Sequence, residues 1–386
     1  MTERIMREGP PATGIVRNLP ATVPFVAPEA LERKMGRPLK LRLGANESAF
    51  GMSPKARQAM LDELERLAWY GDPESQELRA ELATVHRTNT DNLIVGSGID
   101  DLLGLIARTF IEPARTAVTS LGAYPTFNYF VAGCGGRIQP VPYRDDHNDL
   151  EALAARAIQT GARLVYLANP DNPTGTWHNA NDLKDFVEQL PPNSLLLLDE
   201  AYSDFASSDI LPPIDVDDSR VIRLRTFSKA HGMAGARIGF GIAASETVAV
   251  LNKIRVQFGV NRVAQAGALA SLQDRDFVRG VASAVVEGRR DYQKLADDLG
   301  LTCLPSATNF VAIDMGSYER ARATTEALLE QGVFVRMPGA APLNRCIRVT
   351  VGVARDRALF GEVLSDVLAA EGSTRKQRAT SAQSQL

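Results

Sequence analysis

Between residues 93 and 242 the chain repeats one pattern, in which a short apolar run is followed by a turn of small or polar residues. The runs are mostly continuous instead of alternating, which is typical of strands covered by helices on both faces of a sheet. They occupy residues 93–95, 117–119, 164–167, 194–198 and 238–242. The pattern predicts an α/β fold with a large, doubly wound, mostly parallel sheet, whose ligand lies beyond the carboxyl ends of the strands.

The last third of the chain has a different pattern. After a long helix that starts near residue 273, the sequence predicts short strands at 310–313, 333–335 and 347–350 and helices at 318–331 and 355–370. These elements predict a smaller α+β domain. The predicted organisation is an N-terminal arm at 1–45 that joins the small domain, a large domain at 46–272, the small domain at 273–371, and a disordered tail at 372–386. The tail is predicted because that stretch is polar and has no apolar period.

The composition is that of an ordinary globular protein. Hydrophobic residues make up 45% of the 386 positions and the formal net charge is −3, so no basic excess favours nucleic acid or an anionic membrane as a partner. The cysteines at 134, 303 and 346 are far apart, and the four histidines are scattered. This spacing argues against a disulfide framework and against a metal site. No secretory signal is visible, and we predict a cytoplasmic protein.

The strongest chemical candidate is a lysine just after an alternating run at 220–225, which predicts a strand. Thr226, Ser228 and Arg237 surround it in sequence with hydroxyls and a guanidinium fork that match the oxygens of a phosphate. Lys229 can form a Schiff base with an aldehyde, which is how pyridoxal phosphate is attached to its enzymes. Taken alone, a solvated surface lysine is the competing interpretation.

A glycine turn, Gly96-Ser97-Gly98-Ile99, follows the predicted strand at 93–95 and precedes a predicted helix. The backbone N–H groups of such a turn and the N-terminus of the helix form an anion site. Asp101 stands where a dinucleotide-binding fingerprint needs glycine, so NAD is disfavoured. An ordinary turn between strand and helix is the alternative interpretation.

Four more residues stand near predicted strand ends and suit one kind of ligand, a pyridine ring. Asp199 closes a run of four leucines and can pair with the ring nitrogen, which keeps the ring protonated and makes it a better electron sink. Tyr202 and Asn172 can reach the phenolic oxygen of the ring, and Phe127 can stack on its face. Each also has a structural interpretation: Asp199 as a strand-end cap, for example, and Phe127 as simple packing.

Together these motifs resemble a known family. The segments Asn172-Pro-Thr-Gly175 and Asp199-Glu-Ala-Tyr202, with Ser228-Lys229 and Arg237, are similar to those of the fold-type I, pyridoxal-phosphate-dependent aminotransferases of class I/II. The subgroup that the chain resembles is histidinol-phosphate aminotransferase, from its segments at 44–47, 70–73 and 348–352. The resemblance extends over about residues 23–370.

The resemblance implies pyridoxal 5′-phosphate as the cofactor and Lys229, Asp199 and Tyr202 as the catalytic residues. Lys229 is expected to hold the cofactor and then to move the proton of the substrate. The residues implied in cofactor binding are Ser97, Gly98, Ile99, Phe127, Asn172, Asp199, Tyr202, Thr226, Ser228, Lys229, Arg237 and Tyr70. Tyr70 is expected to reach the cofactor of a second subunit, which implies a homodimer with shared active sites.

For the substrate, the resemblance implies binding by Asn46, Phe25, Arg336 and Arg348. Two arginines suit a donor that carries a further anionic group, such as histidinol phosphate, with 2-oxoglutarate as the acceptor. Phe25 stands where the subgroup usually has a tyrosine, and it favours an aromatic amino acid instead.

The expected reaction is a ping-pong transfer of an amino group from an amino donor to a 2-oxo acid. The alternative on the same scaffold is a decarboxylase or lyase of the threonine-phosphate decarboxylase type, because the sequence does not show which bond of the substrate lies perpendicular to the ring. A regulator that binds the cofactor without turnover is disfavoured, since no DNA-binding module is recognisable.

Overall fold

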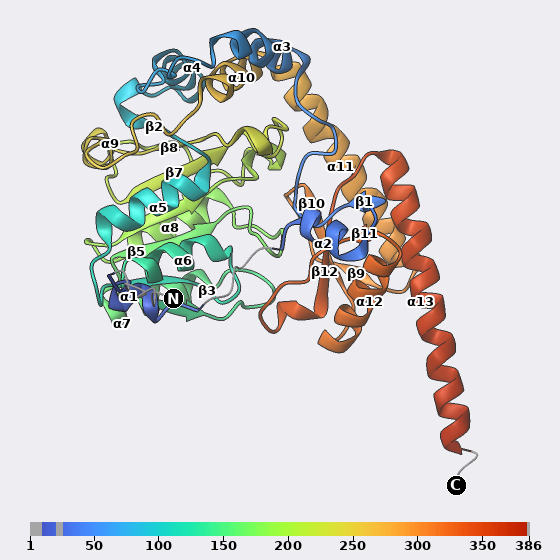
Figure 1. The fold of residues 1–386 in the computed structure, drawn as a ribbon. Coiled ribbons are helices and arrows are strands. Elements are labelled where there is room, and N and C mark those ends of the chain that lie inside the picture. The colour runs from blue at the N-terminus through green and yellow to red at the C-terminus, as the bar shows by residue number, and fades with distance from the viewer. Residues whose placement is uncertain (1–9, 21–25, 384–386) are drawn as a thin grey trace, which may run out of the picture.

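The computed structural model describes residues 10–20 and 26–383. Within them, the larger domain is built on a sheet of seven strands (Figure 1). In sheet order these are β2 (Leu93–Gly96), β8 (Gly239–Ile242), β7 (Val221–Thr226), β6 (Leu195–Asp199), β5 (Leu164–Ala168), β3 (Thr116–Ser120) and β4 (Arg137–Val141). Strand β8 is antiparallel to both of its neighbours, and the other pairs are parallel. The predicted α/β fold with a mostly parallel sheet is confirmed.

Both faces of the sheet are buried, which explains the continuous apolar runs. Successive residues of one strand point to opposite faces, and Leu196 and Leu197 of β6 belong to different apolar clusters. The helices of this domain are α3 (Pro54–Glu63), α4 (Gln76–His86), α5 (Ile99–Phe110), α6 (Pro125–Gly133), α7 (Leu150–Thr160), α8 (Ala180–Gln189), α9 (Ser245–Asn252) and α10 (Arg262–Gln273). Helices α5, α6 and α9 pack on the face of Leu197, and α7 and α8 pack on the face of Leu196.

The register of the parallel strands collects the chemically interesting residues at one edge. Asp199, the last residue of β6, lies beside Ala168 of β5 and Leu224 of β7. The turn after β5 contains Asn172, and the loop after β7 contains Lys229. Parallel strands end at the same edge, so residues that are far apart in sequence become neighbours there.

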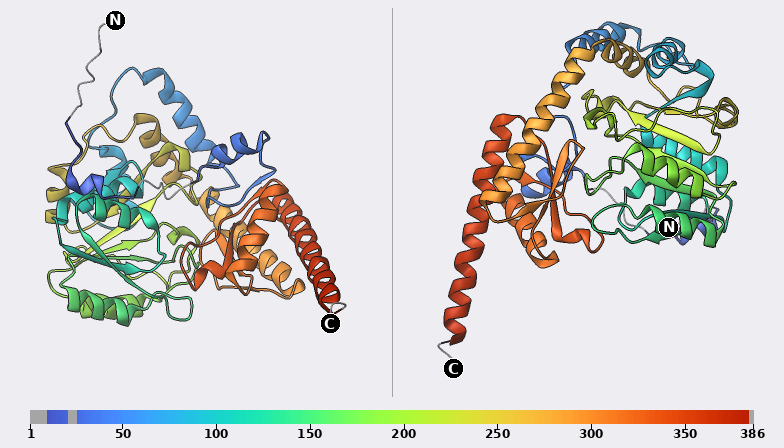
Figure 2. Two further views of the ribbon diagram at one scale, coloured as in Figure 1. Left: turned by 60° about the horizontal axis from the view of Figure 1, so that its bottom comes forward. Right: turned by 180° about the vertical axis from the view of Figure 1, so that it is seen from behind.

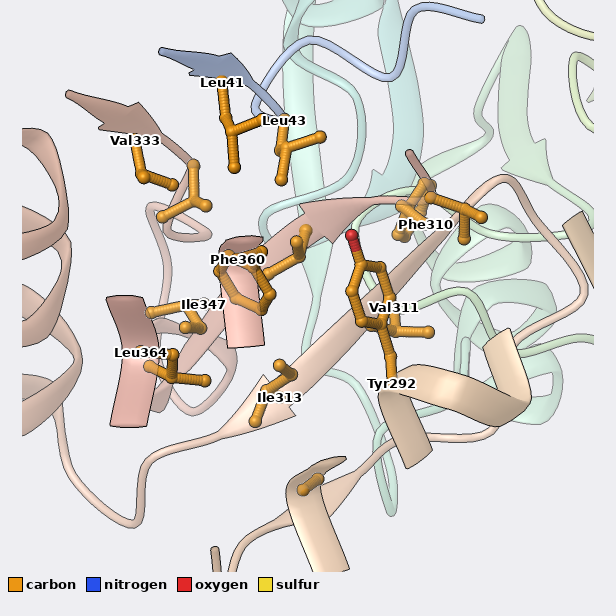
Figure 3. Packing of buried hydrophobic residues seen from close by; sticks show 14 of the residues in the cluster. Leu41, Leu43, Tyr292, Phe310, Val311, Ile313, Val333, Ile347, Phe360 and Leu364 are labelled. Carbon is orange, nitrogen blue, oxygen red and sulfur yellow. The ribbon is translucent and has the colours of Figure 1, made fainter. Parts of the chain in front are cut away.

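The smaller domain has an antiparallel sheet with the order β12-β10-β9, and a separate parallel pair of β1 with β11. Its elements are β1 (Leu41–Arg42), β9 (Thr302–Cys303), β10 (Phe310–Asp314), β11 (Val333–Phe334), β12 (Cys346–Thr350), α2 (Pro28–Met35), α11 (Arg275–Asp298), α12 (Tyr318–Glu330) and α13 (Ala354–Gln383). Figure 3 shows its core, in which Tyr292 of α11 and Phe360 of α13 face Ile347 and Phe310 of the sheet. Leu41, from the N-terminal part of the chain, contributes to the same core.

Helix α11 runs from the large domain to the small domain, as both views of Figure 2 show. Helix α13 continues beyond the body of the protein to Gln383 (Figures 1 and 2). The backbone of residues 372–383 is therefore helical, where we predicted a disordered tail. Alanine, lysine, arginine and glutamine in this stretch have good helix propensity and allow the helix to run on. No helix among residues 10–20 and 26–383 is long and apolar enough to cross a membrane.

The sequence pattern missed several elements of the large domain. The edge strand β4, Arg137–Val141, contains a proline and is only partly buried, so it has no continuous apolar run. Helix α6, Pro125–Gly133, has no charged residue, so it lacks the alternation of apolar and charged faces that predicts a helix. Helix α10, Arg262–Gln273, is rich in alanine, and small residues give a weak apolar period.

Candidate active site

A cavity of about 580 Å³ lies at the carboxyl edge of the large sheet, between the two domains. Residues of both domains line it. Those with polar or aromatic side chains include Asn46, Asp100, Tyr124, Tyr166, Asn172, Asp199, Tyr202, Thr226, Ser228, Lys229, Arg237, Arg336 and Arg348. The structure thus brings together most of the site residues predicted from the sequence.

Lys229 lies in the wall of this cavity, three residues after the end of β7. Its Nζ donates a hydrogen bond to the carbonyl of Asn46 at 3.1 Å and lies 5.5 Å from the centre of the Tyr202 ring. Burial, followed by the nearby charge of Arg348, lowers the pKa of Lys229 to about 8. Near that pH much of the amine is neutral, and the neutral amine is the form that attacks a carbonyl.

Asp199 is a buried carboxylate, and no described residue forms an ion pair with it. Its Oδ2 accepts a hydrogen bond from the hydroxyl of Tyr166 at 2.7 Å, and its Oδ1 accepts one from the backbone N–H of Ala201 at 3.0 Å. These bonds do not compensate for burial, which raises the pKa of Asp199 to about 6. A cation placed against this carboxylate would be strongly favoured.

Tyr202 and Asn172 are held by residues from both domains. The Nδ2 of Asn46 donates to the Tyr202 hydroxyl at 2.8 Å, and Asn46 itself has a positive φ of 54°. The Oδ1 of Asn172 accepts a hydrogen bond from Arg348. The amide group of Asn172 therefore remains able to donate toward a ligand.

Groups that suit an anion gather where β7 ends and α5 begins. Thr226 Oγ1 donates to Ser228 Oγ at 2.9 Å, and both hydroxyl groups lie in the cavity wall with Arg237. Gly98 has a φ of 92°, and a Cβ atom there would come within 2.6 Å of Nη2 of Arg237. Only glycine lets this guanidinium approach the N-terminus of α5, where backbone N–H groups attract anions. Asp100, in the first turn of the helix, lies 3.7 Å from Arg237.

Phe127 and Ser97, both predicted to bind the cofactor, do not line the cavity. Phe127 is fully buried and stacks on Tyr166 with ring centres 5.0 Å apart, so it belongs to the core and does not line the cavity. The aromatic residue at the cavity is Tyr124, which caps the N-terminus of α6 and donates to Asp100 at 3.0 Å. The hydroxyl of Ser97 donates to the carbonyl of Gly259 instead of facing the cavity. Ile99, the first residue of α5, does line it.

Arg336 and Arg348 enter the cavity from the small domain, on two backbone segments that pair with each other. Arg348 stacks 5.2 Å from the centre of the Phe310 ring and donates to the carbonyl of Gly44. Burial and the neighbouring charge of Arg336 lower the pKa of Arg348 to about 10. Two guanidinium groups that share a cavity repel each other, and an anion between them would relieve this repulsion.

Tyr70 does not line this cavity. Tyr70 is 80% exposed and packs against Phe258, with ring centres 4.7 Å apart. Phe25 lies outside the described residues. The residues that sequence analysis missed are Tyr166, Asp100 and Tyr124. The only signal for Tyr166 was a polar hydroxyl in an otherwise apolar strand, two residues before its end.

Comparison with known proteins identifies the class. The family model for aminotransferases of class I and II matches residues 38–365, and the chain belongs to this family. A crystal structure of histidinol-phosphate aminotransferase from Sinorhizobium meliloti, in complex with pyridoxal 5′-phosphate, is 45% identical, covers 95% of this chain and 99% of its own, and superimposes with a TM-score of 0.91. Histidinol-phosphate aminotransferases from Geobacillus sp. (strain WCH70) and Moorella thermoacetica are 34% and 35% identical and cover 92% and 90% of this chain, and 97% and 90% of their own lengths.

Within the family, the chain is a pyridoxal-phosphate-dependent transaminase of the histidinol-phosphate aminotransferase subgroup. The cavity fits this cofactor at both ends, because the buried Asp199 lacks the cation that a protonated pyridine supplies and the glycine at 98 leaves room for a phosphate beside Arg237. When bound, the cofactor supplies an aldehyde for attachment and a ring that withdraws electrons from the substrate.

Proposed function

We propose that this transaminase takes the amino group from histidinol phosphate and transfers it to 2-oxoglutarate in a ping-pong cycle of amino-acid biosynthesis. The observation that carries the proposal is Arg348, because it lines the cavity, no described carboxylate forms an ion pair with it, and its buried Nε has no described hydrogen-bond partner. Arg336 lines the same cavity. Both substrates of this reaction are anionic and match such a pair.

We infer the roles of the other residues from their positions. Lys229 holds the cofactor and then moves a proton at the α-carbon of the substrate. Asp199 keeps the proton on the ring nitrogen, with Tyr166 and the N–H of Ala201 fixing the orientation of its carboxylate. Tyr202 and Asn172 donate to the phenolic oxygen, and Tyr124 replaces Phe127 as our candidate for stacking on the ring.

The phosphate of the cofactor is assigned to the site formed by Thr226, Ser228, Arg237, Gly98 and the N-terminus of α5. Ser97 is a weaker candidate, since its hydroxyl is bonded to Gly259. A rotation about its χ1 angle would be needed before this hydroxyl could face the cavity.

A homodimer with shared active sites is part of the proposal. Tyr70 is exposed at a surface with several other exposed apolar side chains, namely Leu61, Leu64, Leu67, Trp69, Ile254, Val256 and Phe258. They come from the segments 61–70 and 254–258, which are joined where Tyr70 packs against Phe258. Exposed apolar surface is typical of an interface, and a second copy of the chain would cover it. Tyr70 would then reach the phosphate site of the partner. The free cysteines at 134, 303 and 346 support a reducing compartment, the cytoplasm.

The test compares kcat/KM for histidinol phosphate with that for phenylalanine and tyrosine, in the native enzyme and in Arg336→Ala. If Arg336 binds the phosphate of the donor, its removal should reduce kcat/KM for histidinol phosphate by roughly 10- to 100-fold, with a smaller effect on the other donors. Arg355→Ala, at an exposed arginine of the small domain, is the matched control. Equal reductions for all donors, or no turnover of histidinol phosphate, would contradict the proposed donor.

A decarboxylase of the threonine-phosphate type is separated from a transaminase by absorbance. An amino donor without a 2-oxo acid should convert the bound cofactor stoichiometrically to its amine form in a transaminase. Release of carbon dioxide with the aldehyde form retained would favour the decarboxylase.

A further inference from the structure

A second cavity, of about 330 Å³, lies beside the active site but is lined almost entirely by other residues. Its walls come from the end of α4, from β7 and β8, from the end of α10 and from the first turns of α11. Thr226 is shared between the two cavities. The reaction assigned above uses none of the charged residues in this second cavity, so their presence needs another reason.

The charges that line this cavity are mainly positive. Arg225, Arg275 and Arg279 contribute three guanidinium groups, whereas Asp204 is the only carboxylate among its lining residues. Of these arginines, Arg279 pairs with Asp276. Without that pair, Arg225 and Arg275 still outnumber Asp204 among the lining residues, which leaves one net positive charge. The cavity is large enough for a small organic anion.

Arg225 is the most buried of the three, since its side chain is only 16% exposed. Its Nε donates to Glu200 at 2.9 Å, but Glu200 is also bonded to Arg223. One carboxylate thus serves two arginines. Within the described residues, the terminal nitrogens of Arg225 have no hydrogen-bond acceptor, and they are left for a ligand.

Arg275, in the first turn of α11, makes no ion pair with a described residue although it borders the cavity. Neutral hydrogen-bonding groups complete the wall. Nδ1 of His231 lies 2.7 Å from Oγ of Ser271, and His86 packs against Phe240. Burial lowers the pKa of both histidines, so they are neutral at pH 7 and do not add charge.

We propose that this cavity is a binding site for a small dianion, either a phosphate group or a dicarboxylate, held by Arg225 and Arg275 with His231 and Ser271 as neutral partners. The positive charges of Arg225 and Arg275 favour an anion, and guanidinium groups bind phosphate and carboxylate groups alike through paired N–H donors. The ligand would contact Thr226 from behind the phosphate site of the cofactor, so that occupancy of the two cavities can be coupled.

The four histidines of the chain allow a site-specific test. His86 and His231 line this cavity, whereas His147 and His178 lie next to each other in another part of the large domain, with ring centres 6.0 Å apart. The holoenzyme, labelled with ¹⁵N at histidine, is titrated with inorganic phosphate and separately with succinate, at constant ionic strength set with chloride. Signals are assigned with His86→Gln, His147→Gln and His178→Gln, and the remaining signal belongs to His231.

The expected result is a saturable shift of the His86 and His231 signals, with the His147 and His178 signals unchanged. The probe with the lower dissociation constant identifies the ligand class. Arg275→Ala should weaken this binding by roughly tenfold or more, and Arg275→Glu should abolish it. Arg290→Ala, at an exposed position of the same helix, should leave it unchanged.

Two results would overturn the proposal. One is that neither probe shifts the signals of the cavity histidines, or that all four histidines shift together. The other is that Arg275→Ala and Arg275→Glu bind the probes as the native protein does. Because Arg275 is exposed and has no described ion pair, both variants should fold, and circular dichroism of each variant checks this. Binding of phosphate at Arg336 and Arg348 leaves the readout unaffected, since neither arginine lines this cavity.

Discussion

The substitution Asp199→Asn tests the central electrostatic argument, because it should stabilise the empty protein and damage the enzyme. Burial raises the pKa of Asp199 from 3.8 to about 6. Ionising this group therefore lowers the free energy of unfolding of the apoenzyme. This loss is absent below pH 3.8, grows between pH 3.8 and 6, and is constant above pH 6. From the pKa values of 3.8 and about 6, the loss in free energy of unfolding is at most about 3 kcal/mol at pH 7.5 and about 1.6 kcal/mol at pH 5.

An asparagine removes the ionisation, and the hydroxyl of Tyr166 can rotate to accept a hydrogen bond from its amide. We therefore expect the apo form of Asp199→Asn to be more stable than the native apoenzyme, with a larger difference at pH 7.5 than at pH 5. Urea denaturation of the two apo proteins at both pH values measures this difference. Asp185→Asn, at an exposed position of α8, should show no such dependence.

With the cofactor bound, the same substitution should act in the opposite direction. The ring nitrogen loses the carboxylate that keeps it protonated, and we expect turnover to fall by roughly 10²- to 10³-fold. Cofactor affinity should change much less, because Lys229 and the phosphate site are intact. If Asp199→Asn stabilises the apo form equally at pH 5 and pH 7.5, or if its turnover is near normal, the assigned role of Asp199 is wrong.

Three further predictions concern the cofactor and the dimer. Lys229→Ala should abolish both turnover and the cofactor link that borohydride can reduce, and a covalent adduct after reduction of this variant would disprove the assignment. Gly98→Ala places a methyl group 2.6 Å from Nη2 of Arg237 at a φ of 92°, so cofactor affinity, measured by equilibrium dialysis, should fall by roughly tenfold or more; unchanged affinity would exclude this phosphate site. Mixed Tyr70→Phe and Lys229→Ala subunits should regain up to about a quarter of the native activity, because half of the dimers are hybrids with one intact site, and a fully active monomer would refute the shared site.

The large sheet and the edge at which its cavity lies could be predicted from the sequence alone, since strands buried on both faces have continuous apolar runs. The same argument located Lys229, Asp199 and Asn172, because residues that directly follow parallel strands meet at one edge of the sheet. The succession of parallel strands along the chain is enough to predict that residues distant in sequence meet at this edge.

The orientation of individual side chains was decided by tertiary structure. Phe127 and Tyr124 are both aromatic and three residues apart, and only the packing of α6 on Tyr166 shows that Phe127 enters the core while Tyr124 remains at the cavity. The rotamer of Ser97 and the partner of Arg348 likewise depend on segments that are distant in the chain.

The sequence by itself therefore determined which chemistry is available: a lysine, a carboxylate and phosphate-binding groups at strand ends. Tertiary structure decided the pKa values of these groups: burial raises that of Asp199, and burial together with the charge of Arg348 from the small domain lowers that of Lys229. It also decided that Arg225 and Arg275, about fifty residues apart, share a second cavity. Burial and long-range juxtaposition arise only when both domains have folded, so local patterns cannot encode them.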